Sequence, residues 1–185
     1  MNALWSYFWP IFATGLVFGA IAGSVGFRLP TVRPEDRLSS EKVVVPDRRA
    51  KRTLALSIGI GASVAIAALW HGPLGAADRF AAQVERSART TLYYNEIPQV
   101  TARLHHGPLT RQLILVGTAD EFQRSELMRI MGALPGVSSA RWSAEGGGPP
   151  LILEGIAIAV LGFLFGLLLA YLIELRRRYN MQWNW

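Results

Sequence analysis

The chain of 185 residues contains no cysteine. Disulfides, thiolate zinc sites, iron–sulfur clusters and thiol nucleophiles are therefore excluded. The sequence also lacks the G-x-S-x-G nucleophile motif, the H-E-x-x-H zinc motif, the P-loop and the dinucleotide-binding fingerprint. No other catalytic set stands at a spacing that supports chemistry. We therefore expect a protein that is not an enzyme and has no metal, cofactor or evident small-molecule substrate.

Charge is nearly missing from three long stretches. Leu4–Phe27 and Thr53–Trp70 contain no charged residue, and Leu151–Ile173 contains only Glu154. A membrane-spanning helix needs about 20 mostly apolar residues, and the whole chain is 51% hydrophobic with a mean hydropathy of +0.25. The first stretch does not resemble a signal peptide, because its first basic residue, Arg28, follows the apolar run. The sequence predicts three transmembrane helices.

These stretches divide the chain into six predicted segments. In order, they are a first membrane helix (1–28), a basic connector (29–52), a second membrane helix (53–71), an extramembrane domain (72–149), a third membrane helix (150–175) and a tail (176–185). For Glu154, a carboxylate in the first turn of the third helix is favoured over a proton site or a paired charge.

Basic residues are concentrated beside the apolar stretches. Eight of the 19 lie in Arg28–Arg52, whereas the domain is nearly balanced, so we expect membrane topology to explain the charge and expect no nucleic acid. The residues expected to set topology are Arg48, Arg49, Lys51, Arg52, Arg176, Arg177 and Arg178. Because basic segments stay in the cytoplasm, the N-terminus and the domain would be periplasmic and the C-terminus cytoplasmic, in a bacterial inner membrane.

Small residues recur every four positions in each apolar stretch. This spacing removes side chains along one helix face and lets another helix approach closely. The predicted packing residues are Gly15, Gly19 and Gly23, then Ser57, Gly61 and Ala65, then Gly162, Gly166 and Ala170. The sequence does not distinguish a partner helix in this chain from one in another protein.

Tryptophans lie at the ends of the apolar stretches, where an aromatic belt meets the membrane surface. The predicted interface residues are Trp5, Trp9, Trp70, Trp183 and Trp185. We interpret His71, beside Trp70, as an interfacial histidine rather than a pigment ligand. The adjacent pair His105-His106 would point to opposite faces of a strand and is not expected to bind one metal ion.

The domain has the periodicities of an αββαβ module. Apolar residues at steps of four predict a helix over 76–92 with a Glu85–Arg89 pair, and a second helix after Asp120 has Phe122 among its apolar positions. Alternation predicts strands over 99–105, 111–118 and 137–142, the second of them central because both its faces are apolar.

Part of this module resembles the BON domain, an αββαβ module of bacterial envelope proteins. The similarity is carried by the run Leu113-Ile-Leu-Val-Gly-Thr-Ala, the Asp120 helix that follows, and the turn Leu134-Pro-Gly-Val137. It covers about residues 76–142 and none of the apolar stretches. The resemblance implies binding to phospholipid, to other proteins or to copies of itself, and no catalytic residues.

Two functions follow as hypotheses. The first is an accessory or assembly subunit that packs its small-residue helix faces against a larger integral membrane complex, or against copies of itself. The alternative is a membrane-anchored envelope-maintenance or sensing protein whose outer domain binds phospholipid or another envelope component. Both predict contact with membrane lipid.

Overall fold

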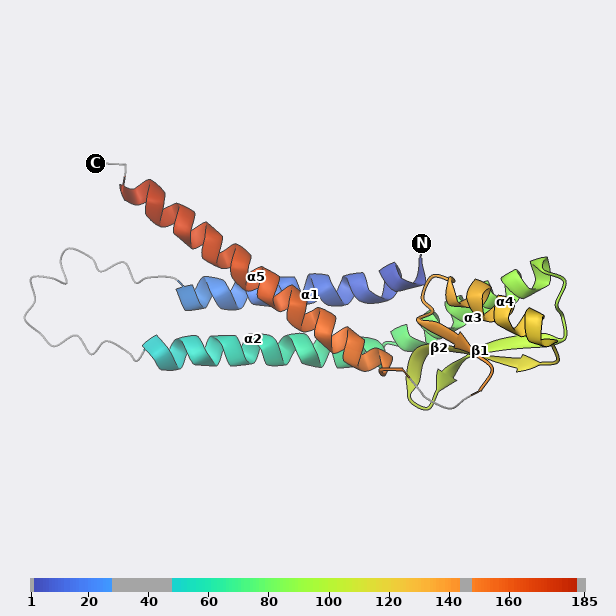
Figure 1. The fold of residues 1–185 in the computed structure, drawn as a ribbon. Coiled ribbons are helices and arrows are strands. Elements are labelled where there is room, and N and C mark those ends of the chain that lie inside the picture. The colour runs from blue at the N-terminus through green and yellow to red at the C-terminus, as the bar shows by residue number, and fades with distance from the viewer. Residues whose placement is uncertain (1, 28–47, 144–147, 183–185) are drawn as a thin grey trace, which may run out of the picture. The chain divides into compact units, whose positions relative to one another are not determined.

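The structure is a computed structural model that describes residues 2–27, 48–143 and 148–182. It is mostly helical, with one three-stranded sheet (Figure 1). In chain order the elements are α1 (Ala3–Phe27), α2 (Arg48–His71), α3 (Ala76–Tyr94), β1 (Val100–His106), β2 (Leu109–Gly117), α4 (Glu121–Gly132), β3 (Ser139–Arg141) and α5 (Leu151–Gln182). Between α2 and α5 the order is αββαβ, as the periodicities predict.

Three helices are long and apolar enough to cross a membrane, over Ala3–Phe27, Arg49–His71 and Leu151–Asn180. Two of these helices are longer than the predicted spans. α2 begins at Arg48 rather than at residue 53, and α5 continues to Gln182 through the predicted tail. Arginine, lysine and alanine are strong helix formers, so the charge that ends an apolar stretch does not end its helix. Most of the predicted connector lies outside the described residues.

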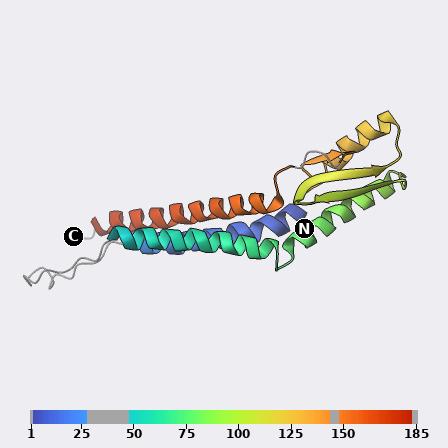
Figure 2. The same cartoon turned by 90° about the horizontal axis from the view of Figure 1, so that it is seen from below.

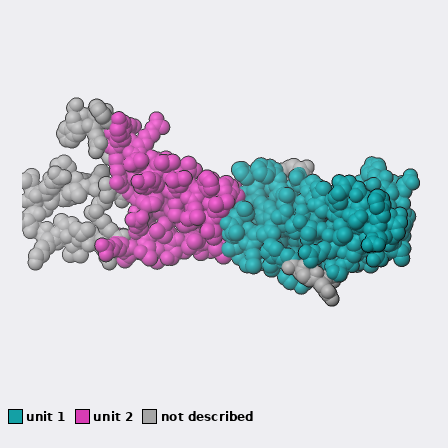
Figure 3. Space-filling model, viewed as in Figure 1, with its two compact units in different colours: residues 1–11, 66–158 teal, residues 12–65, 159–185 magenta. Residues whose placement is uncertain are grey.

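The chain folds into two compact units, coloured separately in Figure 3. Unit 1 comprises residues 1–11 and 66–158, and unit 2 comprises residues 12–65 and 159–185. Unit 1 therefore contains the αββαβ module together with one end of each long helix. It is larger than the predicted domain of residues 72–149, because those helix ends contact the module.

The sheet of unit 1 has the strand order β1-β2-β3. β1 and β2 are antiparallel, with Leu104 opposite Leu113, and β2 and β3 are parallel, with Leu113 beside Ala140. The central position of β2 agrees with its two apolar faces. α3 contacts β1 and α4 contacts β3, and Figure 2 shows the two helices running beside opposite edges of the sheet.

The core of unit 1 consists of large apolar side chains from every layer. The buried members are Phe80, Val84 and Leu92 of α3, Val100 and Leu104 of β1, Leu113 and Leu115 of β2, and Leu127 and Met131 of α4. Each is less than 5% exposed. Burying such a side chain contributes about 1.5–3 kcal/mol, so this core is the main stabilising feature of the module.

α4 has the predicted N-cap at Asp120. Its carboxylate accepts from the amide of Gln123 at 2.7 Å, and the Gln123 side chain returns to the Asp120 amide, which completes a capping box. Phe122, however, was wrongly assigned to the apolar face, since it is 78% exposed. Met131 lies nine positions further along, which at about 100° per residue puts the two side chains on opposite sides of the helix.

Two glycines, one at the end of β2 and one before β3, occupy positions that other residues fit poorly. Gly117 at the end of β2 has φ 148°, and a Cβ there would lie 2.2 Å from the carbonyl oxygen of Gln99. Gly136, in the turn before β3, has φ 103° and packs against Val84. The first lets the two strands approach at their ends, and the second lets the turn pack on α3.

Candidate functional site

In unit 2, the small residues of α1 and α5 face each other. A Cβ added at Gly15 would lie 2.3 Å from the Ala159 carbonyl oxygen, and one at Gly19 would lie 2.0 Å from that of Phe163. From the α5 side, a Cβ added at Gly162 would lie 2.3 Å from the Phe12 carbonyl oxygen, and one at Gly166 would lie 2.1 Å from that of Leu16. Gly23 packs against Ala170. The two helices therefore pack backbone against backbone.

The small residues of α2 behave differently. Ser57, Gly61 and Ala65 are exposed, and a Cβ at Gly61 would meet no atom within 4 Å. Other small residues of α2 pack inside unit 2: Ser63 is fully buried, and Gly59 is buried where a Cβ would lie 2.9 Å from Ala22 and Phe163. Sequence reasoning missed them, because the run Ser57–Ala65 has small residues at nearly every second position and so defines more than one possible face.

Basic residues gather around Phe27 at one end of the unit 2 helices. The Arg52 guanidinium lies 5.2 Å from the Phe27 ring centroid, and Arg178 donates to the Phe27 carbonyl oxygen at 3.3 Å. Arg178 also bonds Glu174 at 3.3 Å. The remaining basic residues with described side chains, Arg49, Lys51, Arg176 and Arg177, are exposed, and the side chain of Arg48 is not described. The C-terminal ends of α1 and α5 and the N-terminal end of α2 thus share one basic surface.

In unit 1, a buried tyrosine links the N-terminal end of α1 to the C-terminal end of α2. Tyr7 is 1% exposed, and its hydroxyl lies 2.6 Å from Nδ1 of His71. The indole Nε1 of Trp70 donates to the Tyr7 carbonyl oxygen at 3.2 Å. The Tyr7 ring also packs on Phe80 of α3, with 5.6 Å between centroids. These contacts join three helices at the position where the sequence predicts a membrane surface.

The predicted interface tryptophans differ in their exposure and contacts. Trp5 and Trp9 are 58% and 51% exposed and stack on each other with 5.1 Å between ring centroids. Trp70 is half-buried and lies under the guanidinium of Arg79 at 5.5 Å. Trp183 and Trp185 lie outside the described residues. Beside Trp70 is a cavity of about 190 Å³, lined by Ser6, Tyr7, Trp70, Ala76, Arg79, Phe80 and Gln83.

Glu154, in the first turn of α5, forms an ion pair with the sheet. Arg111 of β2 donates to its carboxylate at 3.0 Å and to the carbonyl oxygen of Gly136 at 3.1 Å. Both charged side chains are about four-fifths buried, at 23% and 22% exposed. Thr110 forms an isolated bridge with Pro150 immediately before α5. The paired-charge alternative for Glu154 is therefore the one observed, and it attaches α5 to β2.

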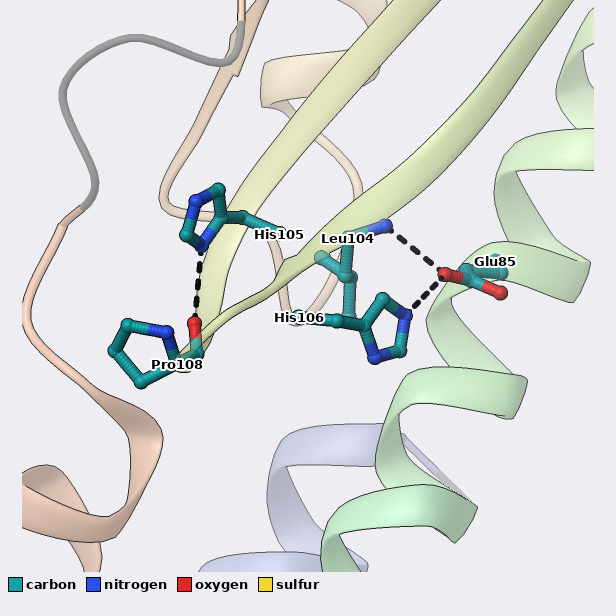
Figure 4. A network of polar contacts seen from close by, with 5 residues as sticks. All are labelled: Glu85, Leu104, His105, His106 and Pro108. Carbon is teal, nitrogen blue, oxygen red and sulfur yellow. Dashed lines mark hydrogen bonds and ion pairs between the residues drawn. The ribbon is translucent and has the colours of Figure 1, made fainter.

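The adjacent histidines make separate contacts, as Figure 4 shows. His105 Nδ1 lies 3.0 Å from the carbonyl oxygen of Pro108, and His106 Nε2 lies 3.2 Å from the carboxylate of Glu85. Glu85 also accepts from the amide of Leu104 at 3.0 Å. The predicted Glu85–Arg89 pair is thus wrong, because Glu85 faces β1. Within residues 2–27, 48–143 and 148–182, no group of three or more histidine, aspartate and glutamate side chains could hold a metal ion.

Comparison of the chain with family models, with curated proteins and with solved structures finds no match.

Proposed function

We propose that this protein is a non-catalytic integral membrane subunit that joins a larger membrane protein complex through the outward face of α2. Unit 1 would present a BON-like contact domain outside the membrane. The observation that carries the proposal is the different use of the three small-residue stripes. The stripes of α1 and α5 are buried against each other, whereas Ser57, Gly61 and Ala65 remain exposed.

An exposed small-residue face on a membrane helix favours a helical partner. Lipid tails are as apolar as leucine side chains, so membrane helices associate mainly through close packing and hydrogen bonds. Small side chains allow that close packing and offer little contact to lipid. On the same helix Leu54 and Ile58 are 61% and 62% exposed and flank the stripe. A second transmembrane helix can therefore approach α2 at Gly61 and be held by these larger side chains.

The basic surface around Phe27 supports a bacterial inner membrane with that end in the cytoplasm. The N-terminus and unit 1 would then be periplasmic, with Trp5, Trp9 and Trp70 at the outer surface. A reporter protein fused at residue 145 tests the orientation. We expect activity from a reporter that works only outside the cytoplasm, and activity from a cytoplasmic reporter would contradict the assignment.

Gly61→Leu tests the partner face. Because nothing lies within 4 Å of a Cβ at this position, the chain should fold normally and lose the complex on purification in mild detergent. Gly59→Leu is the matched control, two residues away on the face packed against Ala22 and Phe163, and should destabilise the chain itself. Mass spectrometry of the purified material is the measurement. A wild-type protein without a stoichiometric partner, or an undiminished complex in Gly61→Leu, would contradict the proposal.

A second candidate function, recognition of phospholipid, is favoured by the cavity beside Trp70. A cation and a hydroxyl, from Arg79 and Ser6, border this small cavity between aromatic side chains. Such a site suits the phosphate of a lipid headgroup at the membrane surface. The same mass spectrometry distinguishes the candidates, because this function predicts a monomer or homo-oligomer that retains lipid and loses it in Arg79→Gln.

A further inference from the structure

Unit 1 contains a second and larger groove that none of the contacts above explains. Its volume is about 780 Å³, and it lies between β1 and the C-terminal part of α3. Its floor and walls include Leu92, Tyr93, Ile97, Ala102, Arg89 and Arg103. Apolar and aromatic surface thus lies between two guanidinium groups, Arg89 on α3 and Arg103 on β1.

The strand beside this groove is an edge strand with free backbone groups. In the antiparallel register of β1 and β2, alternate residues of β1 direct their amides away from β2. Leu104 is one of these, since its amide donates to Glu85, and Val100 is another, since its amide donates to the Ile97 carbonyl oxygen. Ala102 lies between them, so its N–H and C=O point outward. Neither group has a hydrogen-bond partner elsewhere in the described residues.

The charge of the groove favours an acidic occupant. Arg89 and Arg103 form no ion pair within residues 2–27, 48–143 and 148–182. Glu85 lines the groove but already accepts from Leu104 and contacts His106. Glu96 is the other carboxylate in the lining, so two arginines face one uncommitted acid.

We propose that this groove binds an extended segment of a partner protein as a fourth strand, hydrogen-bonded to Ala102. Strand addition to an exposed edge obtains affinity from main-chain bonds and specificity from alternate side chains. Because successive side chains alternate, an acidic residue beside Arg103 would be followed by an apolar residue toward Leu92 and Ile97. The preferred segment is therefore one in which acidic and apolar residues alternate.

Two other occupants fit less well. α3 packs beside β1, with Glu85 bonded to Leu104, and the groove of about 780 Å³ lies between these two elements. A second copy pairing β1 with β1 would bring its own α3 to the same place. A lipid from the surrounding bilayer is also disfavoured, because α3 rises about 27 Å from Ala76 to Tyr94, away from the end of α2.

The inference rests on the proposed role of unit 1 as a contact domain. The full chain in detergent is titrated with a blocked hexapeptide of alternating glutamate and valine, and separately with its lysine–valine counterpart. Binding is measured by calorimetry and by the amide resonance of Ala102. We expect the glutamate peptide to bind about two- to five-fold more tightly, as for an exposed ion pair. Methylation of its strand-facing amide nitrogens should abolish binding.

Substitutions of two arginines that lie in the same row across the sheet provide a matched test and control. Arg103 and Arg141 both lie in register with Ile114, on opposite edges of the sheet, and both are exposed. Arg103→Glu should reverse the peptide preference, and Arg141→Glu should leave it unchanged. Ala102→Pro should abolish binding of both peptides, because it removes the outward N–H of Ala102. The variant should still fold, since this N–H lies outside the β1–β2 ladder and proline is tolerated at such edge positions.

Equal effects of Arg103→Glu and Arg141→Glu would overturn the proposal, as would tight binding of the methylated peptide or no binding at all. So would a dimer of the wild type that Ala102→Pro dissociates, because a second copy would then be the occupant. If Ala102→Pro does not fold, the methylated peptide decides alone. Failure here leaves co-purification through α2 unaffected, so the two proposals fail separately.

Discussion

Unit 1 and unit 2 are each packed internally by side chains of different size, large ones in unit 1 and small ones in unit 2. The module in unit 1 buries leucine, valine, phenylalanine and methionine side chains between a sheet and two helices. In unit 2, α1 and α5 meet at glycines whose neighbours are carbonyl oxygens of the other helix. One chain therefore uses two packing solutions, each in the part of the sequence with the matching hydropathy.

We attribute the difference to the proposed surroundings, which are water for the module and lipid for the helices of unit 2. In water, burying a large apolar side chain is itself the driving force, so larger side chains stabilise more. Between helices in lipid this force is absent, and close backbone contact replaces it. The exposed leucines of α5, together with Phe165 and Ile173, agree with this reading, since they cover its outer surface while Gly162 and Gly166 face α1.

Gly19→Leu should break this comparison most strongly. Its Cβ alone would lie 2.0 Å from the Phe163 carbonyl oxygen, and a backbone atom cannot move aside as a side chain can. We expect a loss of about 3 kcal/mol in the free energy of unfolding, at the upper end of typical overpacking costs. Titration of the detergent-solubilised protein with SDS, followed by circular dichroism, measures it. Gly61→Leu is the control and should change unfolding little; equal losses would show that α1 and α5 do not pack through their glycines.

Arg111→Met should have a smaller effect, confined to unit 1. It removes the guanidinium from Glu154 and leaves a carboxylate about four-fifths buried without its partner. Removing one partner of a fully buried pair costs about 3–5 kcal/mol, and the remaining exposure lowers our expectation to about 1–2 kcal/mol. The double variant with Glu154→Gln should recover part of the loss in the same SDS titration. A double variant less stable than Arg111→Met would show that the pair is not the cause.

The sequence predicted the parts of the fold that depend on local pattern. Long uncharged stretches, the Asp120 cap and the alternation of β1 and β2 are each visible in neighbouring residues, and the structure has all of them. Choices between faces of one helix were harder. α2 has small residues on two faces, and only the position of Ala22 and Phe163 selects Gly59 over Gly61. The partner of Glu85 likewise depends on where β1 lies, which helix spacing does not encode.

Of the candidate surfaces, the sequence predicted the small-residue stripes but not the groove. The stripes on α1 and α5 were proposed from spacing, and the structure brings them together, but spacing alone does not encode that they pair with each other. The groove beside Ala102 has no signature in the sequence. It arises from a strand at the edge of a sheet and a helix beside it, so its residues come from two elements that no local pattern connects.

The smallest expected effect concerns the solvent-exposed surface of α4, where charge rather than packing can be tested. Arg129 hydrogen-bonds the Glu126 carboxylate through Nε at 3.0 Å, and this bond lowers the pKa of Glu126 from its usual value near 4.5. Because the folded pKa lies below the unfolded one, the pair stabilises α4 above the unfolded pKa, and the contribution is lost as pH falls through the folded pKa. In Arg129→Gln, carboxyl NMR titration should show the Glu126 pKa rising toward 4.5, with thermal stability at pH 7 almost unchanged. A Glu126 titration identical in both proteins would show that the ion pair is absent in solution, and a large stability loss at pH 7 would mean that this surface contributes to the packing of unit 1.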